Sequence, residues 1–169
     1  MTKFKKLTKM SKNLETFEVI IECVEGSNLK YEFNEQTEQF DLDFTFGEGV
    51  VFPYNYGFIP GTLGGDGDTL DVMVLSAKPL KTGDRVECVA IGMLEMLDRG
   101  EVDNKIVAVP VDDGYHQKFS NVFQVPKEWV KEWQDFFAEI ARQKKKVLEI
   151  KGIAGKDLAE KEIEKSKIA

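Results

Sequence analysis

The sequence predicts a mainly β fold with additional α-helix, in which short strands form a barrel or sandwich and a long helix packs outside. Between residues 16 and 111, β-branched and apolar runs recur at roughly ten-residue spacing with turns between them. After Pro126 the apolar residues change to a helical period. A chain of 169 residues that is 42% hydrophobic is long enough for one domain with a single core.

The expected strands follow one another with turn residues between them. Residues 16–25 and 29–33 flank Gly26-Ser27-Asn28, which indicates a hairpin. Half of the 14 glycines lie between Gly47 and Gly67, which indicates a loop-rich region. Further extended segments are expected at residues 41–46, 50–56, 70–75, 85–96 and 105–111, the last two joined by a turn at Arg99-Gly100.

The expected long helix begins near Pro126, because proline is favoured in the first helical turn. Its aromatic face is typical of a core contact rather than a cofactor site, so the helix is expected to pack on the barrel. A short strand at residues 146–151 then leads through Gly152 and Gly155 to a polar C-terminal helix. Leu158 and Ile163 are its expected apolar contacts. The aromatic face comprises Trp129, Val130, Trp133, Phe136, Phe137 and Ile140.

Several classes of protein are excluded by composition. No run of 18 apolar residues and no apolar secretory core is present, which predicts no membrane span and a cytoplasmic location. Cys23 and Cys88 are expected to be reduced, buried thiols, because a chain of this size needs no disulfide. His116 is the single histidine, so any metal must be held by oxygen ligands.

The charge is unevenly distributed along the chain. Residues 1–12 contain five lysines and no acidic residue, so a net charge of −7 for the whole chain leaves −12 for residues 13–169. We expect a basic leader at 1–12, either a frayed tail or a segment that docks on an acidic neighbouring subunit, followed by one domain at 13–169. An acidic body disfavours nucleic acid as a partner.

The densest chemical signal is the acidic stretch from Asp66 to Asp71. Asp66 and Asp68 point to one face of extended chain, and Gly67 allows the turn that brings Asp71 toward them. Three carboxylates this close raise one another's pKa unless a cation lies among them. A solvated acidic turn is the alternative, and Asp71 at the entry to an apolar strand argues against it.

A second acidic pair lies at the expected hairpin tip, where Asp98 and Asp103 precede Lys105. An exposed acidic tip is the simpler interpretation of this pair taken alone. If both turns open at one rim of a barrel, their carboxylates can bind two or more Mg²⁺ ions, which favour oxygen ligands and bridge to phosphate. Lys30, Lys105 and Tyr56 are donors of the type that bind phosphate. Together these residues indicate phosphoryl transfer or hydrolysis.

These residues lie in segments that resemble family I soluble inorganic pyrophosphatases. The resemblance covers about residues 16 to 150, and its motifs occur in order. The family implies a five-stranded OB-like β-barrel with a long amphipathic helix and a C-terminal helix outside, Mg²⁺ or Mn²⁺ as a substitute, and hydrolysis of diphosphate to two phosphates by a homo-oligomer, a hexamer in bacteria. The matching segments are DGDTLDVMVL from Asp66, Ile21-Glu22, Lys30-Tyr31-Glu32, FPYNYGFI from Phe52, LDRGEVDNK from Leu97, and Val107-Ala108-Val109-Pro110.

The resemblance also implies a role for each matched residue. Asp68 would accept a proton from the metal-activated water that attacks phosphorus. Lys30, Tyr56 and Lys105 would bind diphosphate or the leaving phosphate, with Glu32 beside them. The implied metal-binding residues are Glu22, Asp66, Asp71, Asp98 and Asp103.

Four positions depart from the family pattern, all on the substrate side: an arginine is replaced by Phe44, a tyrosine by Phe52, and a Tyr-Lys pair by Ile140 and Ala141. These residues either enlarge the core or line an altered pocket. Arg142, one residue past the missing lysine, is the expected replacement cation, and Arg99 at the hairpin tip is another. The run Lys144-Lys145-Lys146, a turn further on, is either a further replacement or, as the favoured interpretation, a solvated face.

The leading hypothesis is therefore an enzyme, a Mg²⁺-dependent inorganic diphosphatase. The alternatives are a phosphohydrolase with altered substrate preference, in which an apolar group contacts Phe44 and Phe52, and a divergent, low-activity protein that binds metal and phosphate. A non-enzymatic OB-type scaffold is a further class, disfavoured as a nucleic-acid binder by the acidic body.

Overall fold

The structure is a computed structural model in which residues 15–168 are described. The basic leader expected at residues 1–12 lies outside the described residues. The strands are β1 (Thr16–Cys23), β2 (Leu29–Asn34), β3 (Gln39–Thr45), β4 (Asn55–Ile59), β5 (Leu70–Val74), β6 (Arg85–Asp98), β7 (Glu101–Val102), β8 (Lys105–Pro110) and β9 (Leu148–Gly155). The helices are α2 (Gly114–Lys118), the short 3-10 helix η1 (Val122–Gln124), α3 (Lys127–Lys144) and α4 (Lys156–Ser166).

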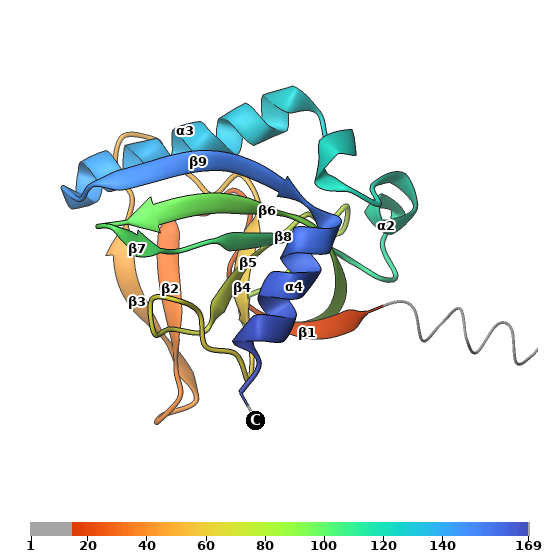
Figure 1. Cartoon of the computed structure of the whole chain (residues 1–169). Coiled ribbons are helices and arrows are strands. Elements are labelled where there is room, and N and C mark those ends of the chain that lie inside the picture. Colours follow the sequence, from red (N-terminus) through yellow and green to blue (C-terminus); the bar gives the residue numbers. More distant parts are fainter. Residues whose placement is uncertain (1–14, 169) are drawn as a thin grey trace, which may run out of the picture.

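A closed barrel forms the centre of the described chain (Figure 1). Within residues 15–168, the five strands β1, β4, β5, β8 and β6 pair in that order, and β6 returns to β1. The β5–β8 pair is parallel and the others are antiparallel. This closure removes the free sheet edges. The predicted five-stranded OB-like barrel is confirmed.

Close backbone contacts within the barrel depend on glycine. At Gly57 in β4, a Cβ atom would lie 2.1 Å from the Ile20 carbonyl oxygen on the neighbouring β1. At Gly92 in β6, a Cβ atom would lie 2.3 Å from Val122 of η1. Both distances are far shorter than any van der Waals contact, so a larger residue at either position would push the chains apart.

Two additions extend the barrel toward the site. Strand β6 continues past the barrel and pairs with β7 across a turn at Arg99-Gly100, and β9 pairs with β6 along its other edge. The β2–β3 hairpin forms a separate two-stranded sheet that stands beside the barrel (Figure 1). The tip of β6–β7, the hairpin and the acidic loop before β5 therefore surround the same opening.

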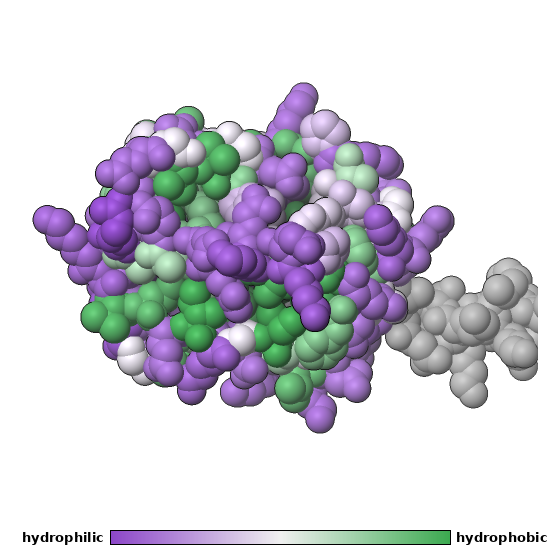
Figure 2. Space-filling model, turned by 90° about the horizontal axis from the view of Figure 1, so that it is seen from above, coloured by the Kyte–Doolittle hydropathy of each residue, from purple (hydrophilic) through white to green (hydrophobic). Residues whose placement is uncertain are grey.

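Helix α3 packs across one end of the barrel (Figure 1). Its aromatic face is turned inward and buried, as predicted. Trp133, Phe136 and Phe137 are buried, and Tyr54 contacts all three rings with centroids 5.8 to 6.5 Å apart. The helix ends at Lys145, which adopts a left-handed conformation with φ 54°. The outer face of this layer is mainly hydrophilic with hydrophobic side chains between (Figure 2).

Several expected elements differ in extent. The segment expected at residues 50–56 forms a strand only from Asn55, because Pro53 cannot donate a ladder hydrogen bond. Strand β9 runs through Gly152 to Gly155 instead of ending before them. On α4, Leu158 is 51% exposed and Ala159 is buried with Ile163, so the expected contact at Leu158 is wrong. Helix α2 and η1 were not expected from the periodicity.

Two general expectations can be compared with the described residues. Cys23 and Cys88 are free and buried, as predicted, and burial raises the pKa of both thiols. In residues 15–168, no helix is long and apolar enough to cross a membrane.

Candidate active site

A cleft of about 680 Å³ opens between the acidic loop before β5, the β6–β7 tip, the β2–β3 hairpin and the end of α3. It brings together ten of the eleven residues that the sequence marks as site residues. Arg142 is the one that does not line it. The ten are Glu22, Lys30, Glu32, Tyr56, Asp66, Asp68, Asp71, Asp98, Asp103 and Lys105.

The acidic loop is held in shape by local hydrogen bonds. Asp66 accepts a hydrogen bond from the Asp68 backbone N–H at 3.1 Å, and Gly67 between them has φ 86°, a left-handed conformation that favours glycine. Thr62 accepts from the Leu70 N–H at 2.9 Å, which fixes the start of β5. The loop thereby presents Asp66 and the exposed Asp68 beside Asp71, the second residue of β5.

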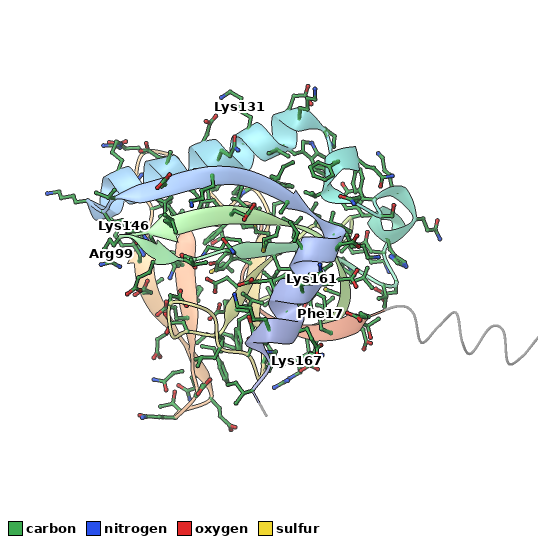
Figure 3. The ribbon with its side chains drawn as sticks, viewed as in Figure 1. Phe17, Arg99, Lys131, Lys146, Lys161 and Lys167 are labelled. Atoms are coloured by element: carbon green, nitrogen blue, oxygen red, sulfur yellow. The ribbon has the colours of Figure 1, made fainter. Side chains whose placement is uncertain are left out.

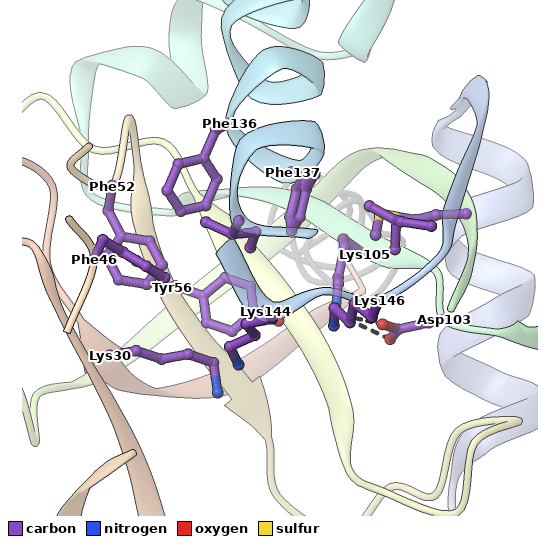
Figure 4. Close-up of a pocket in the computed structure, with 13 residues that line it drawn as sticks. Lys30, Phe46, Phe52, Tyr56, Asp103, Lys105, Phe136, Phe137, Lys144 and Lys146 are labelled. Carbon is purple, nitrogen blue, oxygen red and sulfur yellow. Dashed lines mark hydrogen bonds and ion pairs between the residues drawn. The ribbon is translucent and has the colours of Figure 1, made fainter. Parts of the chain in front are cut away.

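Lys105 lines the cleft, and Figure 4 shows it bonded to the Asp103 carboxylate. Its Nζ atom donates to Asp71 Oδ2 at 2.6 Å and to Asp103 Oδ1 at 2.9 Å. Burial by itself would lower the pKa of Lys105, but the carboxylates of Asp71 and Asp103 outweigh burial and raise it. The ammonium group also lies 5.5 Å from the centroid of the Tyr56 ring. Lys105 therefore stays charged and holds the two carboxylates together.

Two neighbours of Lys105, Asp103 and Tyr56, have raised pKa values. Burial, the largest cause, and Asp71 raise the pKa of Asp103 against the opposing effect of Lys105. Burial raises the pKa of Tyr56 well above its ordinary value, and the nearby charges of Asp71 and Asp103 raise it further. Tyr56 is therefore a neutral hydroxyl at this side of the cleft.

The β6–β7 tip contributes Asp98 together with two cations. Lys146 Nζ donates to Asp98 Oδ2 at 2.7 Å, and Arg99 Nε donates to Asp98 Oδ1 at 3.2 Å. Burial opposes ionisation of Asp98, but Lys146 and then Arg99 outweigh it and lower the pKa. Lys146 and Arg99 lie next to each other at this end of the molecule (Figure 3).

The β2–β3 hairpin supplies the opposite side of the cleft. Lys30 Nζ lies 3.0 Å from both Glu32 Oε1 and Asp43 Oδ2. Glu22 accepts a hydrogen bond from the Phe33 backbone N–H at 2.8 Å, and burial raises its pKa to about 7 despite that bond. Lys30, Glu22 and Glu32 thus line one wall, with the Asp43 carboxylate at its outer end.

The lysine run after α3 differs from its expectation. Lys144 and Lys146 line the cleft instead of forming a wholly solvated face, and only Lys145 points elsewhere among the three. Lys144 Nζ lies 3.6 Å from Asp43 Oδ2, on the carboxylate that also binds Lys30. Burial lowers the pKa of Lys144, and the neighbouring charges of Lys30 and Lys146 lower it further. Figure 4 shows Lys30 and Lys144 reaching the same part of the cleft.

Arg142 has a different environment from the expected one. It forms ion pairs with Glu139 and Glu48 on the outside of α3. The physical reason is helical geometry: Lys144 is four residues after the buried Ile140 and shares its face, whereas Arg142 is two residues after it and faces away. Helical spacing from Ile140 was the sequence signal that distinguishes these two cations.

The residues that depart from the family pattern form the core and a small cavity together. Phe52 and Ile140 are buried, and both line a mainly apolar cavity of about 50 Å³ beside the cleft. Phe44 is half-buried against Phe46, and Lys144 Nζ lies 5.2 Å from the centroid of its ring. The sequence leaves open whether these residues enlarge the core or line an altered pocket. Phe52 and Ile140 do both, since they are buried in the core and also line the cavity.

The donor set of the cleft fits a hard metal ion. Asp66, Asp71, Asp98 and Asp103 offer only oxygen ligands, which suit Mg²⁺. Asp71 and Asp103 already converge on one positive group, the Lys105 ammonium. Among residues 15–168, no three acidic, histidine or cysteine side chains are gathered closely enough to form a metal site in this conformation. Binding of a metal would therefore draw these carboxylates closer together.

Comparison with known proteins gives one consistent result. A family model described as inorganic pyrophosphatase matches residues 19–168. Soluble inorganic pyrophosphatase 1 of Arabidopsis thaliana is 36% identical over 132 residues, which cover 78% of this chain and 62% of that relative. A second Arabidopsis relative, soluble inorganic pyrophosphatase 5, is matched over 60% of its length. The chain thus spans somewhat less than two thirds of these two curated relatives.

Two solved bacterial structures are matched over nearly their full length. The inorganic pyrophosphatase from Neisseria gonorrhoeae is 35% identical with a TM-score of 0.84, over 91% of this chain and 90% of that one. The inorganic pyrophosphatase from Coxiella burnetii is 30% identical with a TM-score of 0.85, over 90% of this chain and 94% of that one. The similarity therefore includes the barrel, the hairpin and the helices that surround the cleft.

Proposed function

Because this chain belongs to the inorganic pyrophosphatase family, we propose that it hydrolyses inorganic diphosphate to two phosphates with Mg²⁺ as its metal. The observation that supports this most is the cleft, in which ten matched site residues from five separate segments of sequence line one opening. The proposed metal-binding aspartates lie at the β5 loop and the β6–β7 tip around Lys105, and Lys30 and Lys144 lie toward the hairpin and α3 together with Glu32 and Asp43. A substrate with two phosphates and bound cations requires both kinds of side chain.

Proteins of this family are generally metal-dependent. We propose two or more Mg²⁺ ions held by Asp66, Asp71, Asp98 and Asp103, with Glu22 nearby, and Mn²⁺ as a substitute. When bound, such ions lower the pKa of water and neutralise phosphate charge. The carboxylates Asp71 and Asp103 meet at one cation position, which supports their assignment to this set.

The remaining cleft residues act directly on water and phosphate. Asp68 is exposed beside Asp66 and would accept the proton of the attacking water. Lys30 and Lys105 would bind phosphate oxygens, and the neutral Tyr56 hydroxyl would donate a hydrogen bond to them. Glu32 keeps the Lys30 ammonium in place through its ion pair. In this arrangement the chain supplies positioning and charge stabilisation more than covalent chemistry.

A phosphohydrolase with altered substrate preference is the second candidate. The observation that favours it is the apolar cavity of about 50 Å³ lined by Phe46, Phe52, Phe136 and Ile140, which opens beside the lysines of the cleft. A small apolar substituent on a phosphate would contact these side chains there. Tyr56, Lys30 and Lys144 line both the cavity and the cleft, so one ligand could contact both.

The test is phosphate release from diphosphate by the purified full chain with Mg²⁺. The expected result is two phosphates per diphosphate, and a loss of roughly 10²- to 10⁴-fold in kcat for Asp68→Asn, the range typical of a general base. Glu35→Gln is the matched control, because Glu35 lines the same cleft without an assigned role. Turnover equal to buffer would contradict the proposal. A panel of phosphoanhydrides in the same assay identifies altered preference.

We further propose a cytoplasmic homo-oligomer, a hexamer by family resemblance, with no nucleic-acid or membrane partner. The two free, buried cysteines support a reducing compartment, and the acidic composition disfavours a nucleic-acid partner. Light scattering of the purified chain measures the oligomeric mass directly. A monomeric mass at micromolar concentration would contradict the oligomer.

A further inference from the structure

A second open groove adjoins the cleft on the outer side of the lysine run. Its volume is about 680 Å³, and it is lined by Asp43, Phe44, Arg99, Gln143, Lys144, Lys145, Lys146 and Val147. Asp43, Arg99, Lys144 and Lys146 line the cleft as well, so the two spaces share one wall of side chains. These shared residues mark where a ligand bound in the cleft would have to pass to reach the groove.

The charge of this outer groove is opposite to that of the chain. Four of its eight lining residues are basic and one is acidic, whereas the whole chain has a net charge of −7. Hydrophilic side chains gather at this end of the molecule, where Arg99 and Lys146 lie together (Figures 2 and 3). A concentrated positive site on an acidic protein attracts anions locally, because nearby charges dominate over distant, screened ones.

The carboxylates at the junction do not balance its cations. Asp43 is shared between Lys30 and Lys144, at 3.0 and 3.6 Å, and Asp98 is shared between Lys146 and Arg99, at 2.7 and 3.2 Å. Lys30 also pairs with Glu32 at 3.0 Å, so four cations share three carboxylates. Burial and the charges of Lys30 and Lys146 lower the pKa of Lys144, which indicates crowding of positive groups. An anionic group placed between these lysines would relieve that repulsion.

We propose that the outer groove is a subsite for a third phosphate, so that the protein binds a linear triphosphate with two phosphates in the cleft and the third against Lys144 and Lys145. This inference rests on the proposed function, because it takes the cleft as the diphosphate site. Lys144 lines both spaces and stands at the junction. Lys145 lines only the groove, so it contacts only the third phosphate.

The test uses methylene-bridged analogues of diphosphate and triphosphate, which cannot be hydrolysed, and calorimetric titration of the full chain with Mg²⁺ held constant. We expect the triphosphate analogue to bind about tenfold more tightly than the diphosphate analogue, the gain of one charge-assisted contact. Lys145→Gln is expected to remove most of that gain and to change diphosphate-analogue affinity by less than about twofold. Titration with ATP as a third ligand distinguishes a nucleotide from a free phosphate chain.

The matched control is Lys131→Gln. Lys131 is an exposed lysine on the same helix, paired with Asp135 at 2.6 Å, and it lines neither space. Lys131→Gln removes the same charge from the chain as Lys145→Gln. Because Lys131 lines neither space, this control should leave the affinities for both analogues unchanged. Equal affinities for the two analogues, or an equal loss in Lys145→Gln and Lys131→Gln, would overturn the subsite. If the protein did not hydrolyse diphosphate but still bound the triphosphate analogue more tightly than the diphosphate analogue, the proposed function would be contradicted and the subsite would stand.

Discussion

The two walls of the cleft have different origins. The acidic wall comes from the barrel, where Asp66, Asp68 and Asp71 lie within six residues of sequence and Asp98 and Asp103 flank one turn. The opposite wall is called the basic wall here for Lys30 and Lys144, although it also carries carboxylates such as Glu32. It is assembled from distant segments, the β2–β3 hairpin and the end of α3, and its lysines meet at Asp43. The acidic wall is therefore fixed by local chain geometry, and the basic wall depends on how α3 packs.

This difference explains which site residues were predictable. Carboxylates at i and i+2 around a glycine identify themselves within a short motif. Lys144 sits 114 residues after its neighbour Lys30 in the sequence, and only the packing of Ile140 against the barrel turns it toward the cleft. Its place next to the missing lysine favours Arg142 as the replacement cation. On a helix, however, two residues that are adjacent in sequence lie on different faces.

Removal of the ammonium group that joins the acidic wall should have the largest effect. Lys105→Gln leaves two mutually repelling, poorly exposed carboxylates, so the free energy of unfolding should fall by about 3 kcal/mol in urea titrations without metal. Adding Mg²⁺ should reduce the difference from wild type, because a bound cation replaces the lost charge. Lys105→Arg is the charge-retaining control. A deficit that Mg²⁺ leaves unchanged would contradict the assignment of Asp71 and Asp103 as metal ligands.

The basic wall can be tested by comparing two cations on one helix. Lys144→Gln should raise KM for diphosphate about tenfold, the cost of one charge-assisted hydrogen bond to phosphate. Arg142→Gln should change KM by less than about twofold, since this residue pairs with Glu139 and Glu48 outside the cleft and exposed ion pairs contribute little. Steady-state kinetics on Lys144→Gln and Arg142→Gln measure the KM for diphosphate of each and show which of the two cations binds substrate. The reverse ranking would restore Arg142 as the substrate-side cation.

A carboxylate outside both walls should affect stability alone. Asp113 is buried before α2 and accepts hydrogen bonds from the Tyr115 and Ala77 backbone N–H groups at 2.9 Å each. Burial opposes its ionisation, but these bonds outweigh burial and lower its pKa. Asp113→Asn should therefore cost about 1 to 2 kcal/mol of unfolding free energy at pH 7 and leave KM unchanged.

The pH dependence of that cost follows from the sign of the shift. A carboxyl whose folded pKa is lowered contributes its stability above the unfolded value, here 3.8, and loses it as the pH falls through the folded pKa. The unfolding free energies of wild type and Asp113→Asn should therefore begin to converge as the pH falls below about 4, and meet once the pH is below the folded pKa of Asp113. A gap that stays constant down to pH 2 would show that the Asp113 charge is not the source of the stability.

The fold was more predictable than the site because it depends on repeated patterns. Most of the strands and the aromatic face of α3 follow from periodicity, which many residues support at once. The two-residue β7 does not, and the expected hairpin of residues 16–25 with 29–33 is wrong, because β1 pairs with β4 and β6 while β2 pairs with β3. The short α2 depends instead on Asp113, whose side chain caps the helix by accepting from Tyr115, and five residues carry too little periodicity to reveal it. Leu158 was misplaced because the α4 contact face is centred on the small Ala159, which hydrophobicity alone does not mark.

Whether both walls of the cleft bind one diphosphate with its metal ions can be seen in a crystal structure of the full chain with Mg²⁺ and the methylene-bridged diphosphate analogue. We expect phosphate oxygens within hydrogen-bond distance of Lys30, Lys105 and Lys144. We expect the metal ions on four aspartates, Asp66, Asp71, Asp98 and Asp103. The two walls would then act on one ligand. An analogue bound outside the cleft, or bound to the acidic wall with Lys30 and Lys144 turned away, would contradict it.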